Sequence, residues 1–405
     1  MMTRAGTPVQ SLIERAAPDP GRPTLLCFSH LRWDFVFQRP QHLLTRFAKE
    51  MSVVVWEEPM DIASRETPFL KVTQAEGFPN VRIVVPHLPE GMSEQAREAS
   101  LKRLLDAHVA SVRGPLVAWY YTPMMLPFSK HITPDVTVYD AMDELSKFKF
   151  APEQLLSYEQ ELIDRADLVF TGGSSLYEAK KDRHDSVHLF PSSVDRAHFC
   201  KARAGLFDPA DQEDLPHPRL GYYGVIDERF DIELLDQIAA MRPDWSFVMV
   251  GPVVKIEADE LPKRPNIHYL GSKTYDELPA YLGGWDVALM PFAMNESTQF
   301  ISPTKTPEYL AGGKPVVSTP VKDVVRHYGH LDAVGIAGDA DGFVAACEKA
   351  LALAGDRGGK WLAEADLMLS SSSWDTTQAR MAGLIAEVLG TRAEASTPAL
   401  LVAAE

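Results

Sequence analysis

Residues 300–319, FISPTKTPEYLAGGKPVVST, are the stretch around which the rest of the sequence is organised. Thr304 and Thr306 are suited to cap the start of a helix, because their side-chain oxygens can accept hydrogen bonds from unpaired backbone N–H groups. Gly312–Gly313 ends that helix, and the apolar run that begins at Pro315 is typical of a buried strand. The stretch therefore predicts a loop, a short helix, a turn and a strand of an α/β sheet.

The same stretch carries groups suited to a phosphate ligand. A helix that begins beyond the edge of a parallel sheet directs N–H groups into the crevice where such sheets bind ligands. Lys305 adds a positive charge there, and Glu308, one helical turn later, can accept hydrogen bonds from ribose hydroxyls. An ordinary connection between a strand and a helix, with Lys and Glu on its surface, fits this spacing equally well.

The composition fits a globular protein with two α/β domains. The chain has 405 residues, of which 45% are hydrophobic and 24% are charged, and this length exceeds one ordinary core. A formal net charge of −16 argues against nucleic acid as a partner, because phosphate backbones attract basic surfaces. The three cysteines lie far apart in the sequence, which predicts a reducing compartment and neither a disulfide framework nor a zinc site.

The two ends of the sequence have the composition of flexible segments. Residues 1–23 contain several prolines and residues 391–405 are rich in Ala, Thr and Glu, so we expect a flexible leader and a flexible tail. No apolar run approaches the roughly 20 residues that a membrane-spanning helix needs. The beginning of the sequence also lacks the apolar core of a signal peptide.

The N-terminal half alternates strands and helices, which predicts a parallel sheet. The first strand, residues 24–29, precedes a loop that is dense in aromatic and basic side chains. This loop is either the wall of a ligand site or an aromatic anchor that holds the loop on the core. The candidate ligand residues in it are Arg32, Trp33, Gln38 and Arg39.

Two later strands of this half end in polar side chains at the same edge of the sheet. The strand over residues 115–121 delivers Tyr121 to the crevice, and the next strand ends in the acids Asp140, Asp143 and Glu144. Carboxylates at this position can orient a hydroxyl, act as a base or bind a cation, although capping the next helix is a simpler role. A metal site is not predicted, because the spacing of these acids matches no standard ligand set.

The C-terminal half begins a second α/β domain after a polar, Pro- and Asp-rich linker at residues 201–218. Its first strand leads to Gly224, which lets a ligand approach the backbone, and then to Arg229, which can clamp a diphosphate through two hydrogen bonds. A later strand ends before three polar residues that are candidates for the same ligand site: Glu296, Ser297 and Thr298.

The stretch Pro303–Val317 resembles the donor-site segment of the GT-B glycosyltransferases, in the broad family 4-like group, and particularly of its bacterial polysaccharide and teichuronic-acid-type enzymes. In that family the Glu that matches Glu308 holds the nucleotide ribose, and a nearby Lys or Arg, here Lys305, holds the diphosphate. A second Glu, which holds the sugar hydroxyls, usually stands seven intervening residues earlier, where this chain has Phe300. The nearest polar substitutes are Glu296, Ser297 and Thr298.

The resemblance covers most of the chain, from about residue 24 to about residue 375. It implies an α/β fold with two Rossmann-like domains that face each other across a cleft. The acceptor domain would comprise residues 24–200 and a helix at about 375–390 that crosses back to it, and the nucleotide-sugar domain would comprise residues 219–374. The acceptor would contact side chains of the first domain, namely Arg32, Trp33, Gln38, Arg39, Tyr121 and Asp140.

The implied reaction moves a sugar from a UDP- or GDP-linked donor to a saccharide or a lipid-linked saccharide, with retention and without a metal or other cofactor. Arg229 and Lys305 would neutralise the leaving diphosphate. Asp143 matches the end of a strand where the family often carries a His-Asp pair, with Met142 in the place of the His. The other expected donor contacts are Gly224, Ser302, Thr304, Thr306 and Glu308.

Two rival functions are compatible with the same residues. One is a GT-B nucleotide-sugar epimerase, which needs acid and base carboxylates and no acceptor. The other is a non-catalytic GT-B subunit that binds a sugar nucleotide or a partner, which the departure at Phe300 favours. The composition and the resemblance together predict a cytoplasmic protein with at most peripheral association with the inner face of the cell membrane.

Overall fold

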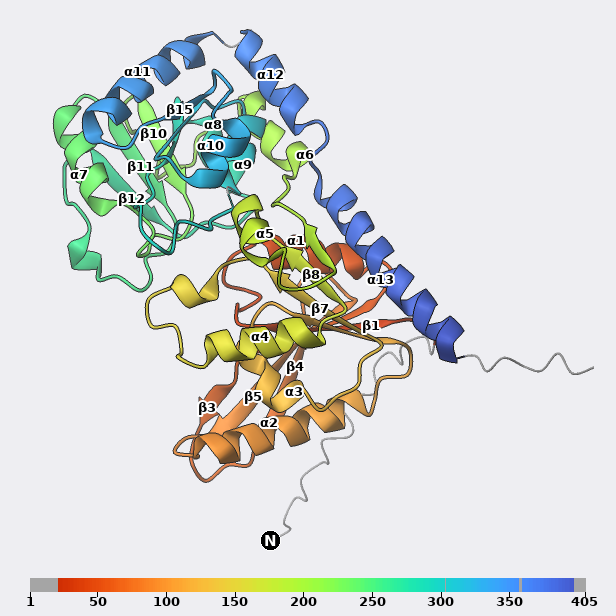
Figure 1. Ribbon diagram of the computed structural model, residues 1–405. Coiled ribbons are helices and arrows are strands. Elements are labelled where there is room, and N and C mark those ends of the chain that lie inside the picture. Colours follow the sequence, from red (N-terminus) through yellow and green to blue (C-terminus); the bar gives the residue numbers. More distant parts are fainter. Residues whose placement is uncertain (1–20, 303, 357–358, 397–405) are drawn as a thin grey trace, which may run out of the picture.

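The computed structural model describes residues 21–302, 304–356 and 359–396, which form two α/β domains (Figure 1). Most of the expected leader (1–23) and much of the expected tail (391–405) therefore lie outside the described residues. The last helix continues to Ser396, so the beginning of the expected tail is helical. Among the described residues, no helix combines the length and the apolar character needed to cross a bilayer.

The N-terminal domain is built on a nine-stranded sheet in the order β3-β5-β2-β1-β6-β7-β8-β9, with β4 paired to β5. All neighbours are parallel except β4, which runs antiparallel to β5. The short strands β3 and β4 were not predicted from the sequence. The strands are β1 (Thr24–Ser29), β2 (Ser52–Glu57), β3 (Met60–Ile62), β4 (Phe69–Gln74), β5 (Val81–Pro89), β6 (Leu116–Tyr120), β7 (Val136–Ala141), β8 (Leu168–Thr171) and β9 (Val187–Leu189).

Helices cover both faces of this sheet, which explains why every residue of β1 is buried. One face packs on Leu43 of the first helix and Met381 of the last, and the other face packs on Leu101 and Leu162 of two intermediate helices. The helices of this domain are α1 (Arg39–Phe47), α2 (Glu94–Val109), α3 (Leu126–Ser129), α4 (Leu155–Arg165), α5 (Ser174–Lys180) and α13 (Trp374–Ser396).

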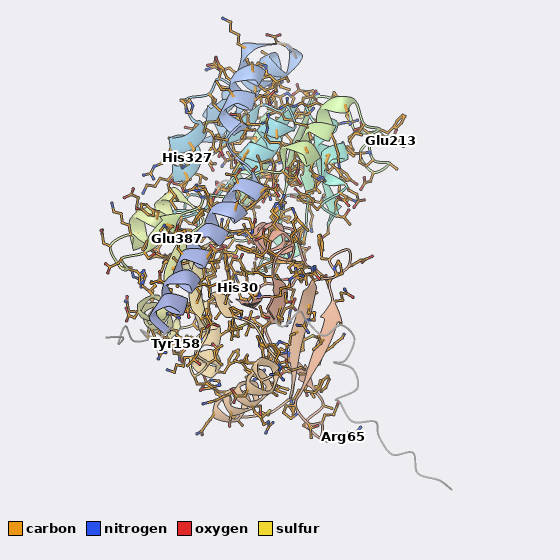
Figure 2. The ribbon with its side chains drawn as sticks, turned by 90° about the vertical axis from the view of Figure 1, so that its right-hand side faces the viewer. His30, Arg65, Tyr158, Glu213, His327 and Glu387 are labelled. Carbon is orange, nitrogen blue, oxygen red and sulfur yellow. The ribbon has the colours of Figure 1, made fainter. Side chains whose placement is uncertain are left out.

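The last helix, α13, leaves the C-terminal domain and lies along the N-terminal one, as Figure 2 shows around Glu387. Trp374, Met381 and Ile385 belong to the N-terminal core, because their spacing places them on one face of the helix. A helix that crosses back to the N-terminal domain was expected at about 375–390. The first and the last described elements, β1 and α13, thus belong to the same domain.

The C-terminal domain has a six-stranded parallel sheet in the order β12-β11-β10-β13-β14-β15. Its strands are β10 (Arg219–Tyr223), β11 (Ser246–Val250), β12 (Ile267–Gly271), β13 (Val287–Met290), β14 (Val316–Ser318) and β15 (Val334–Ile336). The helices around it are α6 (Arg196–Phe199), α7 (Ile232–Met241), α8 (Leu278–Gly283), α9 (Lys305–Ala311), α10 (Lys322–Tyr328), α11 (Ala340–Gly355) and α12 (Lys360–Leu369).

The expected linker at 201–218 is part of the C-terminal domain in the structure. Phe199 and Ala202 lie in the C-terminal core, and the fully buried Gln212 accepts a hydrogen bond from Trp285 Nε1 and donates one to Tyr281 O. Polar side chains of this segment bond to the C-terminal domain, so the segment is not a free linker. The boundary between the domains therefore lies before residue 199.

The two domains contact each other directly next to the crevice at the ends of their strands. Ser175 at the start of α5 donates its hydroxyl to Asp323 Oδ1 of α10 at 2.7 Å, and its backbone N–H donates to the other oxygen at 3.1 Å. Ser174 Oγ lies 2.8 Å from His327 Nε2. A carboxylate of one domain thus caps a helix of the other, which holds the carboxyl ends of the two sheets face to face.

Candidate functional site

A cavity of about 200 Å³ lies between the two domains, where loops from the carboxyl ends of both sheets meet. Several residues singled out in the sequence line it: Gln38, Arg39, Asp143, Gly224, Arg229, Ser302, Thr304, Lys305 and Glu308. The others lie outside its lining: Arg32, Trp33, Tyr121, Asp140, Glu296, Ser297, Thr298 and Thr306.

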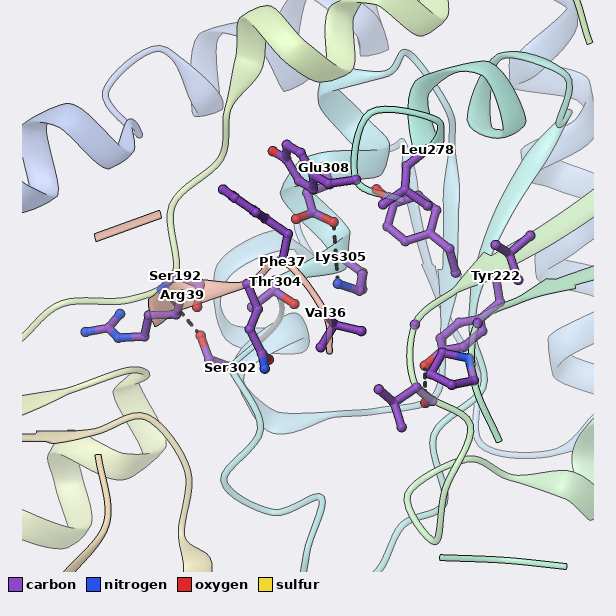
Figure 3. A pocket seen from close by; sticks show the side chains of 18 of the residues that line it. Val36, Phe37, Arg39, Ser192, Tyr222, Leu278, Ser302, Thr304, Lys305 and Glu308 are labelled. Atoms are coloured by element: carbon purple, nitrogen blue, oxygen red, sulfur yellow. Dashed lines mark hydrogen bonds and ion pairs between the residues drawn. The ribbon is translucent and has the colours of Figure 1, made fainter. Parts of the chain in front are cut away.

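Lys305 and Glu308 form a charged pair in the cavity wall. Both belong to the first turn of α9, and Lys305 Nζ lies 3.6 Å from Glu308 Oε2 (Figure 3). Burial raises the pKa of Glu308, and the Lys305 charge opposes this shift. Glu308 is 8% exposed, and its Oε2 has no hydrogen-bond partner among the described residues. An oxygen buried in this way is open to a donor group of a ligand.

The two threonines at the start of α9 have different roles from those expected. Thr304 occupies the N-cap position and lines the cavity, but its side chain makes no capping hydrogen bond. Thr306 is fully buried and its hydroxyl contacts Met290 Sδ at 2.9 Å. Met290 is itself a residue of the cavity wall, whereas Thr306 is not, so the expected donor contact of Thr306 stays a prediction.

Arg229 is held by a neighbour that the sequence analysis did not identify. Its guanidinium donates to Asp227 through Nε at 2.9 Å and through Nη2 at 2.7 Å. The Arg229 Cζ atom also lies 5.4 Å from the centroid of the Phe148 ring. Burial works against the charge of Arg229, but the hydrogen bonds and the charge of Asp227 outweigh it, so the pKa of Arg229 is raised. Because Asp227 is itself buried, removing Arg229 would leave an unpaired carboxylate in the structure.

Gly224 allows the backbone to pass close to Lys305. Its φ of +150° lies in a region that side chains disfavour, and a Cβ at this position would lie 2.6 Å from Tyr222 Oη and 3.4 Å from Lys305 Cε. A larger residue would therefore displace the wall of the cavity beside Lys305.

The three polar residues after β13 form a turn and do not reach the cavity. Asn295 Oδ1 accepts hydrogen bonds from the backbone and the hydroxyl of Ser297 and from the backbone of Thr298. The side chain of Glu296 is 78% exposed and pairs with Lys147 of the other domain at 3.2 Å. The expectation that these residues contact the donor is corrected, because Asn295 and Lys147 already bind their polar groups.

Arg39 and Asp140 form a buried ion pair across the N-terminal sheet edge. Arg39 donates through Nε at 3.0 Å and Nη2 at 2.9 Å to the two oxygens of Asp140, and through Nη1 at 2.8 Å to Phe190 O. Tyr121 lies beside this pair in the core, where burial, and then Asp140, raise the pKa of Tyr121. Asp140 therefore holds Arg39 in place, and its expected acceptor contact is corrected. The Tyr121 hydroxyl has no hydrogen-bond partner among the described residues, so its acceptor contact stays a prediction.

Arg32 and Trp33 anchor the loop on which they lie. Arg32 Nη1 donates to Glu57 Oε2 at 2.9 Å and to Glu58 O at 2.7 Å, while the Trp33 backbone donates to Glu57 Oε1 at 2.7 Å. The Trp33 ring packs in the N-terminal core against Phe78. For these two residues, the aromatic anchor is the alternative that the structure supports, and the expected acceptor contact is corrected.

Asp143 lies in the cavity wall, after the end of β7. Burial raises the pKa of Asp143 to about 6, since the opposing charge of Arg229 is partly offset by Asp227. Glu144 turns away from the cavity and pairs with the buried Lys180 at 2.8 Å. Of the three acids at this strand end, Asp143 alone lines the cavity.

An aromatic cluster at one side of the cavity was not predicted. Phe37 lies 4.7 Å from Tyr275 between ring centroids, and Tyr275 stacks on His198 at 4.2 Å. His42 stacks on Trp374 at 4.7 Å. The aromatic loop before α1 was the one signal in the sequence, but its partners lie in the other domain and in α13.

Comparisons with known proteins relate the chain to glycosyltransferases. Residues 217–353 match the family model described as Glycosyl transferases group 1. Over 257 residues the chain is 28% identical to TuaH of Bacillus subtilis (strain 168), which is named as a teichuronic acid biosynthesis glycosyltransferase. That match covers 59% of this chain and 64% of the length of TuaH.

The whole chain resembles solved structures of the same architecture. A sucrose-phosphate synthase from Thermosynechococcus elongatus has a TM-score of 0.66 at 16% identity, and the match covers 91% of this chain and 100% of that one. The trehalose-6-phosphate structure from E. coli bound with UDP-2-fluoro glucose has a TM-score of 0.65 at 12% identity, with 90% and 99% covered. The chain therefore has the GT-B fold, and residues 217–353 of its C-terminal domain match the Glycosyl transferases group 1 family.

Proposed function

We propose that this protein transfers a sugar from a nucleoside-diphosphate sugar, UDP- or GDP-linked, to a saccharide or lipid-linked saccharide acceptor in polysaccharide biosynthesis. The observation that carries the proposal is the Lys305–Glu308 pair in the interdomain cavity, with one carboxylate oxygen of Glu308 left without a hydrogen-bond partner among the described residues. A cation beside a carboxylate oxygen that has no hydrogen bond suits a diphosphate next to a ribose. The UDP-2-fluoro glucose bound to the E. coli relative supports a nucleotide-sugar donor.

In this reaction the bond between the anomeric carbon and the diphosphate oxygen breaks, and a bond from the anomeric carbon to an acceptor oxygen forms. Lys305 and the remaining N–H groups of Arg229 would stabilise the charge that develops on the leaving diphosphate. The acceptor proton would pass to Asp143 or to the departing phosphate. The second route gives retention of configuration, which we propose from the family resemblance.

Release of free nucleoside diphosphate tests the activity directly. Incubation with UDP-glucose, UDP-galactose and GDP-mannose, with and without saccharide acceptors, should give UDP or GDP with at least one donor. An absence of product with every donor, combined with donor binding, would favour the non-catalytic subunit.

We further propose a cytoplasmic location, with at most peripheral contact with the inner face of the membrane, in keeping with a lipid-linked acceptor.

Glu308→Gln should lower the affinity for UDP by about tenfold while the fold is retained, because an amide is a weaker acceptor for two ribose hydroxyls. Affinity for pyrophosphate, which has no ribose, should stay unchanged. Calorimetric titration with both ligands measures the difference. Equal losses for UDP and pyrophosphate would show that Glu308 acts through the position of Lys305 and not through the ribose.

Activity should survive removal of divalent cations with EDTA. On this proposal, Arg229 and Lys305 supply the positive charge at the leaving group, and a metal ion would duplicate it. Nucleoside diphosphate release is measured in matched samples with EDTA alone and with added Mg²⁺ or Mn²⁺. Activity that disappears in EDTA and returns with the metal would contradict the assignment of Arg229 and Lys305.

A further inference from the structure

Glu228 is a buried carboxylate that the mechanism above does not use. It lies in the loop after β10, between Asp227 and Arg229, and its side chain is 2% exposed. Neither of its oxygens has a hydrogen-bond partner among the described residues. A buried carboxylate is costly unless other groups compensate its charge, so this position is held for a reason other than packing.

The nearest cation to Glu228 is Lys255, which stands at the centre of a small polar cluster. Lys255 Nζ lies 3.7 Å from Glu228 Oε1, beyond hydrogen-bond distance, and 4.8 Å from the centroid of the Phe148 ring. The backbone of Lys255 has a φ of +62°, which is uncommon for a residue other than glycine. After the larger effect of burial, the charge of Lys255 lowers the pKa of His30. For Asp143, whose pKa burial raises, Lys255 is the weakest of the charged neighbours, after Arg229, Asp227 and Arg39. Lys255 therefore lies near both groups.

His30 adds a second unpaired polar atom from the opposite domain. The residue follows β1, and its Nδ1 is buried without a hydrogen-bond partner in the described part of the chain. Burial, and then Lys255, lower the pKa of His30 to about 4, so the ring is neutral near pH 7. A neutral imidazole offers one donor and one acceptor, which suits hydroxyl groups. Figure 2 labels His30 on the N-terminal domain.

We propose that His30, Asp143, Phe148, Glu228 and Lys255, here called the Lys255 cluster, form the acceptor subsite and bind a neutral, hydroxyl-rich saccharide. This inference rests on the proposed glycosyl transfer. Glu228 would accept hydrogen bonds from sugar hydroxyls, Lys255 would donate them, and His30 would do either. Asp143 links the cluster to the cavity, because it lines the cavity wall beside Arg229.

The charges of the cluster favour a neutral sugar over the two charged alternatives. Of the cations near Asp143, Arg229 is already paired with Asp227 and Arg39 with Asp140. The carboxylates of Asp143 and Glu228 therefore share Lys255, and a sugar acid or a phosphate would meet net repulsion. A metal is not indicated, since no group of three or more potential ligands occurs among the residues that the structure describes. The donor diphosphate has its own cations at Lys305 and Arg229.

The test measures saccharide binding to UDP-saturated protein by saturation-transfer NMR. The probes are the neutral methyl α-D-glucopyranoside and methyl α-D-galactopyranoside, and the anionic methyl α-D-glucuronide. Wild-type protein should bind at least one neutral glycoside, and Glu228→Gln and Lys255→Met should each weaken that binding by about tenfold. The exposed Glu257 provides a matched control, and Glu257→Gln should leave saccharide binding unchanged.

Two further readouts separate this inference from the donor assignment and from misfolding. UDP affinity should be unchanged in both variants, and Glu228→Gln should not lower the melting temperature, since the carboxylate lacks hydrogen bonds to lose. Neutral glycosides that bind equally well to Glu228→Gln, tighter binding of the glucuronide, or no glycoside binding at all would each overturn the inference. If wild-type protein binds a neutral glycoside but does not bind UDP, the donor assignment is rejected and this subsite is supported.

Discussion

Lys305→Ala should weaken UDP binding by about 1.5–3 kcal/mol, or roughly 10- to 150-fold, because a charge-assisted contact to the diphosphate is lost in a partly desolvated cavity. Lys305 lines the cavity at the start of α9, with Nζ directed toward Glu308 (Figure 3). The loss should be larger than for Glu308→Gln, since Lys305 faces the charged part of the ligand. Pyrophosphate binding should fall in parallel with UDP binding.

Isothermal titration of UDP and of pyrophosphate measures this effect, with two matched variants. Lys305→Arg keeps the positive charge and should retain most of the affinity. Lys322→Ala removes an exposed lysine of α10 that lies outside the cavity lining and should change nothing. Unchanged UDP affinity in Lys305→Ala would remove Lys305 from the donor site.

Arg229→Ala is a poorer test of the same idea, although the sequence analysis treated the two cations alike. The structure shows Asp227 buried against Arg229 through two hydrogen bonds. Removing the guanidinium leaves Asp227 without its partner and so affects stability as well as binding. A lower affinity in this variant has to be read together with its melting temperature.

Asp143→Asn should reduce turnover by about 100-fold or more, the usual size of a lost general base or of a lost contact to a reacting hydroxyl. UDP binding should change little, because Lys305 and Glu308 remain in place. Steady-state kinetics with saturating donor measures the loss. Asp182→Asn, on the exposed surface of the same domain, serves as the control. Wild-type turnover in Asp143→Asn would exclude a chemical role for this carboxylate.

The pH profile gives an independent check on Asp143. With burial raising the pKa of Asp143 to about 6, and with Arg229, Asp227, Arg39 and Lys255 as its charged neighbours, the carboxylate is ionised at pH 7 and loses its charge below pH 6. If the ionised form is active, kcat/KM should fall as pH drops through about 6. Asp143→Asn should lack this acidic limb.

The same shift predicts how Asp143 affects stability. Its pKa in the folded protein lies above the ordinary value of about 3.9 for unfolded Asp, so the folded state binds the proton more tightly. The stabilising contribution is complete below pH 4 and is lost as pH rises toward 6. Asp143→Asn should therefore melt at a higher temperature than wild type at pH 8, with the difference disappearing near pH 4.

Local sequence pattern was sufficient to predict the elements that carry the proposed donor site. Buried apolar runs predicted β1, β10 and β14, because a strand covered on both faces needs apolar residues throughout. The i, i+3 spacing of Lys305 and Glu308 placed both on one face of α9 before any tertiary contact was known. Gly224 likewise predicted that the backbone at this position lies close to other groups of the site.

Tertiary structure decided where the other polar side chains point. Asp140 and Arg39 are separated by 101 residues and pair only because β7 and α1 meet, which no local pattern records. The Lys255 cluster is a stronger case, since Glu228 and Lys255 both belong to the C-terminal domain and His30 joins them only when the two domains face each other. The sequence by itself thus determined most of the strands and helices, through periodicity and spacing within single elements, while the proposed donor roles of Lys305 and Glu308 came from the family resemblance. The tertiary structure alone decided which carboxylates are neutralised internally and which stay open to a ligand, because that depends on partners brought together from distant segments.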